Sequence, residues 1–319
     1  MQTHLIYGAI LGISLIGAFI TWTAEPNTIS GDEIELLPGK KEDLQEIEWN
    51  SPTSFVRITQ KENDGSNESL WVFYKEEEKS IKKNFKASSA GDKLFSSYSP
   101  LTVIRKLDAP SAEKLVEIGL QDSKTTVTIK RNDRSRVLEI GNEAYGTKDV
   151  YVRDTNSGQV YLVDDEKFRT LQHAKSRLPN HDLWSLNDIY KVQHATLITE
   201  NQAQITFEHK NHQDKQNARW EQRTGKGIEN ADSRTEQITT WMSKIIALRA
   251  GEYEEIDEKD LQLKFSLTFH IEENQETLKV YMQNEDWYAN STFSEGFVQL
   301  TSRSIEGLYS DIPSISQLQ

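Results

Sequence analysis

Four short segments decide the fold of this chain: TVTI (126–129), VLEI (137–140), VYV (150–152) and VYLV (160–163). β-branched and aromatic residues dominate them, and apolar and polar side chains alternate along the first two, as they do in strands. The turn residues Asn156-Ser157-Gly158 separate the last two segments. We therefore expect four consecutive strands that pair mainly antiparallel.

The residues before and after these segments predict a hairpin and helices. Ser54–Ile58 and Leu70–Tyr74 are strand-like, and Asp64-Gly65 between them is a strong hairpin signal. Apolar positions recur at helical spacing in three further ranges, which are 92–107 (interrupted at Pro100), 110–118 and 164–178. One unit is thus expected to consist of a strand hairpin, a helix and four further strands.

The second half of the chain repeats this order. Trp71 matches Trp220, Leu138 matches Leu278, and the pair Phe168 and Leu171 matches Ile305 and Leu308. The offset between matched positions falls steadily along the chain, as insertions and deletions in loops would produce. The sequence therefore predicts a duplicated unit, with first and second α+β repeats at 41–180 and 181–319. A chance likeness between two ordinary α+β domains is the alternative.

The start of the chain carries an uncharged apolar run, LIYGAILGISLIGAFITWT (5–23). As a helix it would reach ~28 Å, about the thickness of a bilayer's hydrocarbon core. Cleavage after Ala24 would place the bulky Trp22 where a signal peptidase needs a small side chain, whereas Trp22 suits the membrane interface. Residues 1–24 are therefore expected to be a cytoplasmic start and retained transmembrane anchor, and 25–40 a linker. A buried core helix is the alternative.

Small residues line one side of this run. Gly8 and Gly12 form a G-x-x-x-G pair, and Ser14 and Ala18 form a second small pair. Such spacing lets two helices approach closely in lipid, so these four residues are candidates for transmembrane helix packing. The alternative is that they have no partner, because Gly is common in membrane helices.

Composition excludes several functions. The 319 residues carry a formal net charge of −13, which argues against nucleic acid as a partner. The chain has no cysteine, and it contains neither a Walker A loop nor a G-x-S-x-G elbow. His209 and His212 lack an evident third ligand for a metal. We therefore expect no catalytic residue, no cofactor and no metal site.

An ordered series of short motifs gives a family resemblance. Its points are Ile118-Gly119-Leu120, Leu138-Glu139-Ile140-Gly141, Val150-Tyr151-Val152-Arg153 and the later Trp184–Ile189. The series resembles an uncharacterised bacterial family, a domain of unknown function whose members are often found with gliding-type (GldG-like) ABC transporters. The resemblance covers roughly 41–312, but the matching "GL" and "IG" points are missing after Leu261. It implies a membrane-anchored periplasmic protein and supplies no catalytic residues.

These observations favour a non-enzymatic accessory or scaffold subunit of an ABC-transporter-type envelope complex that acts by protein–protein binding. The expected partners are a polytopic membrane protein and an ATPase. The expected location is the inner membrane, crossed once, with the body in the periplasm. One alternative is a periplasmic glycan- or peptide-binding module in which Trp71, Trp184 and Trp220 stack on the ligand. A carboxylate-based hydrolase is a further alternative.

Overall fold

The computed structural model describes residues 34–61, 69–79, 81–132, 134–224, 227–230 and 234–316. These residues form two nine-stranded sheets and one two-stranded sheet, with short helices beside the large sheets. Every strand pair among them is antiparallel. The expectation of an α+β fold with mainly antiparallel sheets is confirmed.

The first unit contains a sheet of order β5-β4-β3-β2-β8-β9-β10-β11-β7, and β1 pairs separately with β6. Its elements are β1 (Ile34–Leu37), η1 (Lys41–Asp43), β2 (Leu44–Asn50), β3 (Ser54–Lys61), β4 (Ser69–Glu76), β5 (Ile81–Lys86), α2 (Ser89–Ser97), β6 (Leu101–Val103), β7 (Arg105–Lys106), α3 (Ala112–Glu117), β8 (Thr126–Arg131), β9 (Arg134–Glu143), β10 (Val150–Asp154), β11 (Val160–Val163), α4 (Glu166–Gln172) and α5 (Ala174–Arg177).

The second unit has the sheet order β15-β14-β13-β12-β17-β18-β19-β20-β16. Its elements are η2 (Ile189–Lys191), β12 (His194–Thr199), β13 (Gln204–Lys210), β14 (Arg219–Thr224), β15 (Gly227–Asn230), α6 (Thr235–Ile246), β16 (Tyr253–Glu254), η4 (Glu258–Asp260), β17 (Gln262–Ile271), β18 (Asn274–Gln283), β19 (Asp286–Ser291), β20 (Phe297–Leu300), α7 (Ser302–Ser310) and α8 (Ile312–Ser316).

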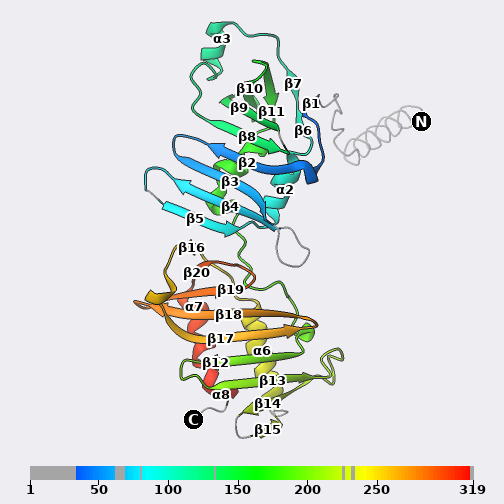
Figure 1. The fold of residues 1–319 in the computed structure, drawn as a ribbon, viewed down its shortest axis with the longest axis vertical. Helices are drawn as coiled ribbons and strands as arrows, with labels where there is room; N and C mark the ends of the chain where they lie inside the picture. The colour runs from blue at the N-terminus through cyan, green and yellow to red at the C-terminus, as the bar shows by residue number, and fades with distance from the viewer. Residues whose placement is uncertain are drawn as a thin grey trace, which may run out of the picture.

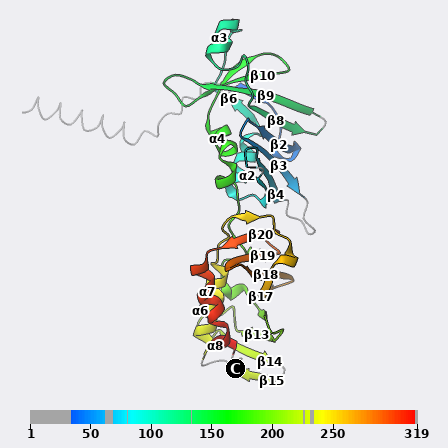
Figure 2. The same cartoon turned by 90° about the vertical axis from the view of Figure 1, so that its left-hand side faces the viewer.

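The two large sheets have the same topology. Reading both orders side by side, β2 corresponds to β12, β8 to β17, and the short edge strand β7 to β16. The units lie end to end, so that the molecule is long and narrow (Figure 1). Helix α4 in the first unit and α6, α7 and α8 in the second lie on the same side of the sheets (Figure 2). One continuous cluster of buried apolar residues runs through both units.

One predicted helix is wrong in its second half. Residues 92–107 were expected to be a helix, but α2 ends at Ser97, and the next residues form β6 and β7. β6 pairs with β1 and β7 pairs with β11. Pro100 cannot continue the helix, and the β-branched residues after it favour strands. The apolar spacing of Leu101 and Val103 instead marks alternate buried positions of β6.

The units meet at β5 and β16. Lys83 on β5 is buried, and its ammonium lies 2.6 Å from a Glu252 carboxylate oxygen and 3.4 Å from one of Glu254. Beside this pair, the ring of Phe85 lies 5.6 Å from the ring of Tyr253. Edge strands expose unpaired backbone groups, which makes a covered edge more stable than an open one. Each unit thus covers an edge of the other.

Candidate functional site

The three family motifs of the first unit meet at one place on its sheet. Gly119 follows α3 with a φ of +72°, a conformation that glycine adopts without strain. The Asn142 backbone N–H donates to the Ile118 carbonyl oxygen over 2.8 Å. A Cβ atom on Gly141 would collide with that same oxygen. Two motif glycines therefore allow the α3 segment to lie directly against β9.

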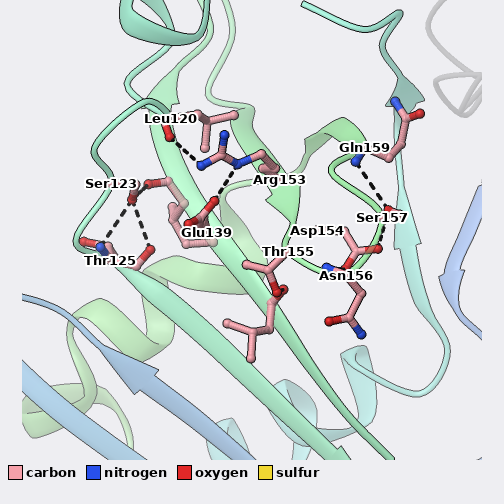
Figure 3. Close-up of polar contacts among 12 residues, drawn as sticks. Leu120, Ser123, Thr125, Glu139, Arg153, Asp154, Thr155, Asn156, Ser157 and Gln159 are labelled. Atoms are coloured by element: carbon pink, nitrogen blue, oxygen red, sulfur yellow. Dashed lines mark hydrogen bonds and ion pairs between the residues drawn. The ribbon is translucent and has the colours of Figure 1, made fainter.

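Arg153 joins the motifs through its guanidinium (Figure 3). Its Nε lies 2.5 Å from a Glu139 carboxylate oxygen, and its Nη2 donates to the Leu120 carbonyl oxygen over 3.0 Å. Such charge-assisted bonds are stronger than neutral ones. In the second sheet, the positions that correspond to Glu139 and Arg153 are Lys279 and Asn290, which also lie opposite each other. A lysine and an asparagine cannot form an ion pair. The corner formed by Leu120, Glu139 and Arg153 thus belongs to the first unit.

Next to Arg153, the Asp154 carboxylate organises the β10–β11 turn. It accepts hydrogen bonds from the Asn156 N–H at 3.1 Å, the Ser157 hydroxyl at 2.6 Å and Arg136 Nη2 at 2.9 Å. Burial alone would raise the pKa of Asp154, but these three donors outweigh it and hold the pKa below its usual value. Figure 3 shows this turn beside the corner. Asp154 is therefore a structural anion that orients Arg136.

Arg136 faces a cleft of about 850 Å³ at the end of the β8–β9 hairpin. Arg131 and Arg134 also line the cleft, and they are cross-strand partners. Residues directly opposite in a pair, or two apart in a strand, have side chains on one face of the sheet. The hairpin geometry therefore places three guanidinium groups around one opening.

Arg131 is the buried member of this group. It donates to the carbonyl oxygens of Lys40, at 3.1 Å, and Tyr98, and to the Ser99 hydroxyl at 2.9 Å. Its Nε is buried without a hydrogen-bond partner among the described residues. Burial lowers the pKa of Arg131, and the nearby Asp43 opposes this shift. All its hydrogen-bond acceptors are thus neutral groups.

The other buried lysines and arginines among the described residues are paired directly with carboxylates. Lys83 pairs with Glu252, and Lys264 lies 3.2 Å from a Glu200 carboxylate oxygen. By contrast, no carboxylate of the described residues lies within ion-pair distance of Arg131. An unpaired buried charge is costly, and the only carboxylate among the described residues that line the cleft, that of Asp43, lies beyond ion-pair distance of Arg131.

Sequence reasoning missed these arginines. The signal that could have found them is the run RNDRSR (131–136), which places three arginines within six residues of an acidic chain. The sequence showed the family motifs, but in the structure the side chains and backbone groups of these motifs bond to one another and form the corner. They position the neighbouring cleft by fixing β9 and β10.

The tryptophans proposed for ligand stacking are buried. Trp71, Trp184 and Trp220 are 8%, 3% and 0% exposed. Trp184 and Trp220 belong to the hydrophobic core, and Trp71 lies beneath the Lys61 ammonium, 4.5 Å from the ring centre. None of the three presents a free face on which a sugar could stack, which corrects that expectation.

Other predicted residues lie outside the structure's reach. The helix-packing residues Gly8, Gly12, Ser14 and Ala18 and the interface residue Trp22 fall outside the described residues. Within the described part of the chain, no helix combines the length and apolar character needed to span a membrane. The same part contains no group of three or more residues placed to hold a metal ion.

Comparison with known proteins gives one match. The family described as "Domain of unknown function (DUF4340)" matches residues 80–265, which is more than half of the chain. The matched range runs from the residue before β5 to the fourth residue of β17, and it includes both the corner and the arginines of the cleft. No curated protein and no solved structure matches the chain.

Proposed function

The chain belongs to the DUF4340 family of domains of unknown function, and we propose that it is a non-enzymatic scaffold subunit that binds partner proteins at a membrane. The proposed complex is an ABC-transporter-type assembly of the cell envelope. In it, a polytopic membrane protein and an ATPase would be the partners, and the chain would bind no nucleic acid.

The observation that carries this proposal is the boundary between the two units. Lys83 pairs there with Glu252 and Glu254. In addition, Lys61 lies 3.2 Å from a Glu295 carboxylate oxygen. Lys86 lies 4.0 Å from the ring centre of Phe293 and donates to its carbonyl oxygen over 3.3 Å. A scaffold must hold two binding surfaces at a fixed separation. A boundary with apolar, ionic and cation–π contacts supports that role.

The position in the envelope rests on the sequence. The apolar run 5–23 is long enough to anchor the chain in the inner membrane, with the body in the periplasm. The transporter association rests on the resemblance described above, and GldG-like transporters are the expected class. The acidic body suits a protein that does not lie on anionic lipid.

The carboxylates near the cleft do not favour a hydrolase. Glu139 and Asp154 each pair with an arginine, and Asp43 hydrogen-bonds to the Lys40 backbone N–H. A glycosidase needs two carboxyl groups that face each other across the scissile bond. No such pair lines the cleft among the described residues, and the absence of catalysis stays a prediction.

Affinity purification tests the proposal. The full chain, tagged at its C-terminus and expressed at native level, is extracted in mild detergent after cross-linking in the cell. We expect a polytopic membrane protein and an ATPase to be enriched over an untagged control strain. Recovery of the chain alone would overturn the proposal.

A further inference from the structure

Two arginines of the cleft, Arg131 and Arg134, form no ion pair with a described residue, and Asp43, which also lines the cleft, acts on Arg131 only from beyond ion-pair distance. Arg136 pairs with Asp154, whereas Arg131 is buried among neutral acceptors, and the exposed Arg134 forms no hydrogen bond or ion pair with a described residue. Arg131 and Arg134 are also directly opposite each other on β8 and β9. Like charges in that arrangement destabilise a sheet unless an anion lies between them.

The walls of the cleft define what kind of anion fits. Leu37, Pro38 and Ile129 give it an apolar side, and Asn132 and Asn156 add neutral polar side chains. The Asp43 carboxylate also lines it, but it accepts hydrogen bonds from the Lys40 backbone N–H and from Asn132. Its volume of about 850 Å³ is far larger than a single phosphate or sulfate ion needs, and it lies in the range of sites for sizeable organic ligands. A ligand with carboxylates, apolar groups and amide groups matches all three features.

We propose that this cleft binds an acidic, extended peptide segment of a partner protein, with a peptide carboxylate bound by the exposed Arg134 and the buried charge of Arg131 adding to the positive potential behind it. Arginine suits this task because its planar guanidinium forms paired hydrogen bonds to a carboxylate. Arg136 is held by Asp154 and shapes the wall. The inference rests on the proposed scaffold function and names the chemistry of one of its contacts.

A peptide pair tests the inference directly. Fluorescein-labelled SELESEL is titrated with the full chain in detergent, and its anisotropy is compared with that of the neutral SQLQSQL. We expect the acidic peptide to bind at least about tenfold more tightly, and its affinity to fall as salt is added. Equal affinity for the two peptides would overturn the inference.

A matched pair of variants locates the binding. Arg134→Gln removes the exposed cation of the cleft and should weaken the acidic peptide about tenfold. Arg303→Gln, at an exposed position of α7 in the other unit, should leave the affinity unchanged. Arg303→Gln should unfold like the parent, and Arg134→Gln should be at least as stable as the parent, because it removes the like charge opposite Arg131. An unchanged affinity of Arg134→Gln would also overturn the inference.

Inorganic phosphate separates a peptide site from a simple anion site. Saturation of the cleft by phosphate when neither peptide binds would overturn the inference in favour of a small anion. If neither peptide binds but the membrane complex is recovered, the scaffold proposal stands and only the inference that the cleft binds an acidic peptide is wrong. If the peptides bind but no complex is recovered, the cleft stands and the scaffold proposal fails.

Discussion

His209 lies flat against Trp220 in the core of the second unit, with ring centres 3.9 Å apart. Its Nδ1 lies 3.1 Å from the Val192 carbonyl oxygen, so the neutral ring donates there and carries its lone pair on Nε2. Nε2 is buried without a partner among the described residues. A proton added to Nε2 would place a positive charge in the core, away from water, which disfavours the charged ring.

This burial predicts a pH dependence. Desolvation lowers the pKa of His209 from 6.5 to about 4, so the folded state binds a proton less readily than the unfolded chain. The stability that the neutral His209 ring contributes to the folded state is fully present above pH ~6.5 and is lost as the pH falls towards about 4. The loss should reach about 2–3 kcal/mol, measured as the difference in unfolding free energy between parent and His209→Gln.

The exposed His173 provides the control for this measurement. His173→Gln removes an exposed ring, so its unfolding free energy at pH 7 should match that of the parent. A difference between parent and His209→Gln that does not change between pH 7 and pH 4 would contradict the account of the burial of His209. Single residues of this kind were not predictable from the sequence, where His209 and His212 looked like a polar loop. Only the register of β13 against β14 brings His209 onto Trp220.

At the scale of elements, the sequence predicted the hairpin β3–β4, the helix α2 and the strands β8 to β11 in their order, but it predicted neither β5, β6 and β7 nor the register. Matching the sheets from Leu138 and Leu278 aligns Trp220 with Leu70 and not with Trp71. A shift of one residue in a strand moves a side chain to the other face of the sheet. Accordingly, Trp220 lies in the core and Trp71 on the opposite face. The shared residue type suggested the match of Trp71 with Trp220, but the pairing between strands decides which face of the sheet each side chain occupies.

The α3 segment gives a prediction at this scale. Gly141→Ala places a methyl group against the Ile118 backbone carbonyl, which cannot move without shifting the corner. We expect a loss of about 1–3 kcal/mol in unfolding free energy, measured by urea denaturation. Gly307→Ala on α7 is the matched control, because nothing lies within 4 Å of its added methyl group. It should stabilise the helix by up to about 1 kcal/mol.

Equal behaviour of the two alanine variants would show that the corner is not rigid. The sequence identified the motif glycines and Arg153, but it could not show that they meet. Residues 118 to 153 come together only when β8, β9 and β10 pair. The cleft is a consequence of the same pairing, since it lies where the β8–β9 hairpin passes β1.

At the scale of the whole molecule, the equivalent topology of the two sheets follows from the repeated order of elements. The boundary between them does not, because it depends on contacts between residues about 170 positions apart, such as Lys83 and Glu252. In a linear reading, β5 is a lysine-rich strand and 252–258 an acidic stretch, and each looks like a solvated surface. In the structure, Lys83 of one run pairs with Glu252 and Glu254 of the other.

Charge reversal at this boundary should separate the units. Lys83→Glu places a buried carboxylate against Glu252 and Glu254, which are 62% and 39% exposed at their side chains. Because water screens the two glutamates, we expect a loss of about 1–3 kcal/mol and not the larger cost of a fully buried clash. The radius of gyration from X-ray scattering should rise, and the link at 178–183 should become more sensitive to protease. Lys82→Glu, at the neighbouring exposed position, should change neither quantity.

Adding Glu252→Lys to the Lys83→Glu variant should restore the parent's scattering, because the ion pair reforms in the opposite sense. A compact Lys83→Glu variant would mean that the apolar contact of Phe85 with Tyr253 holds the units together without the ion pairs.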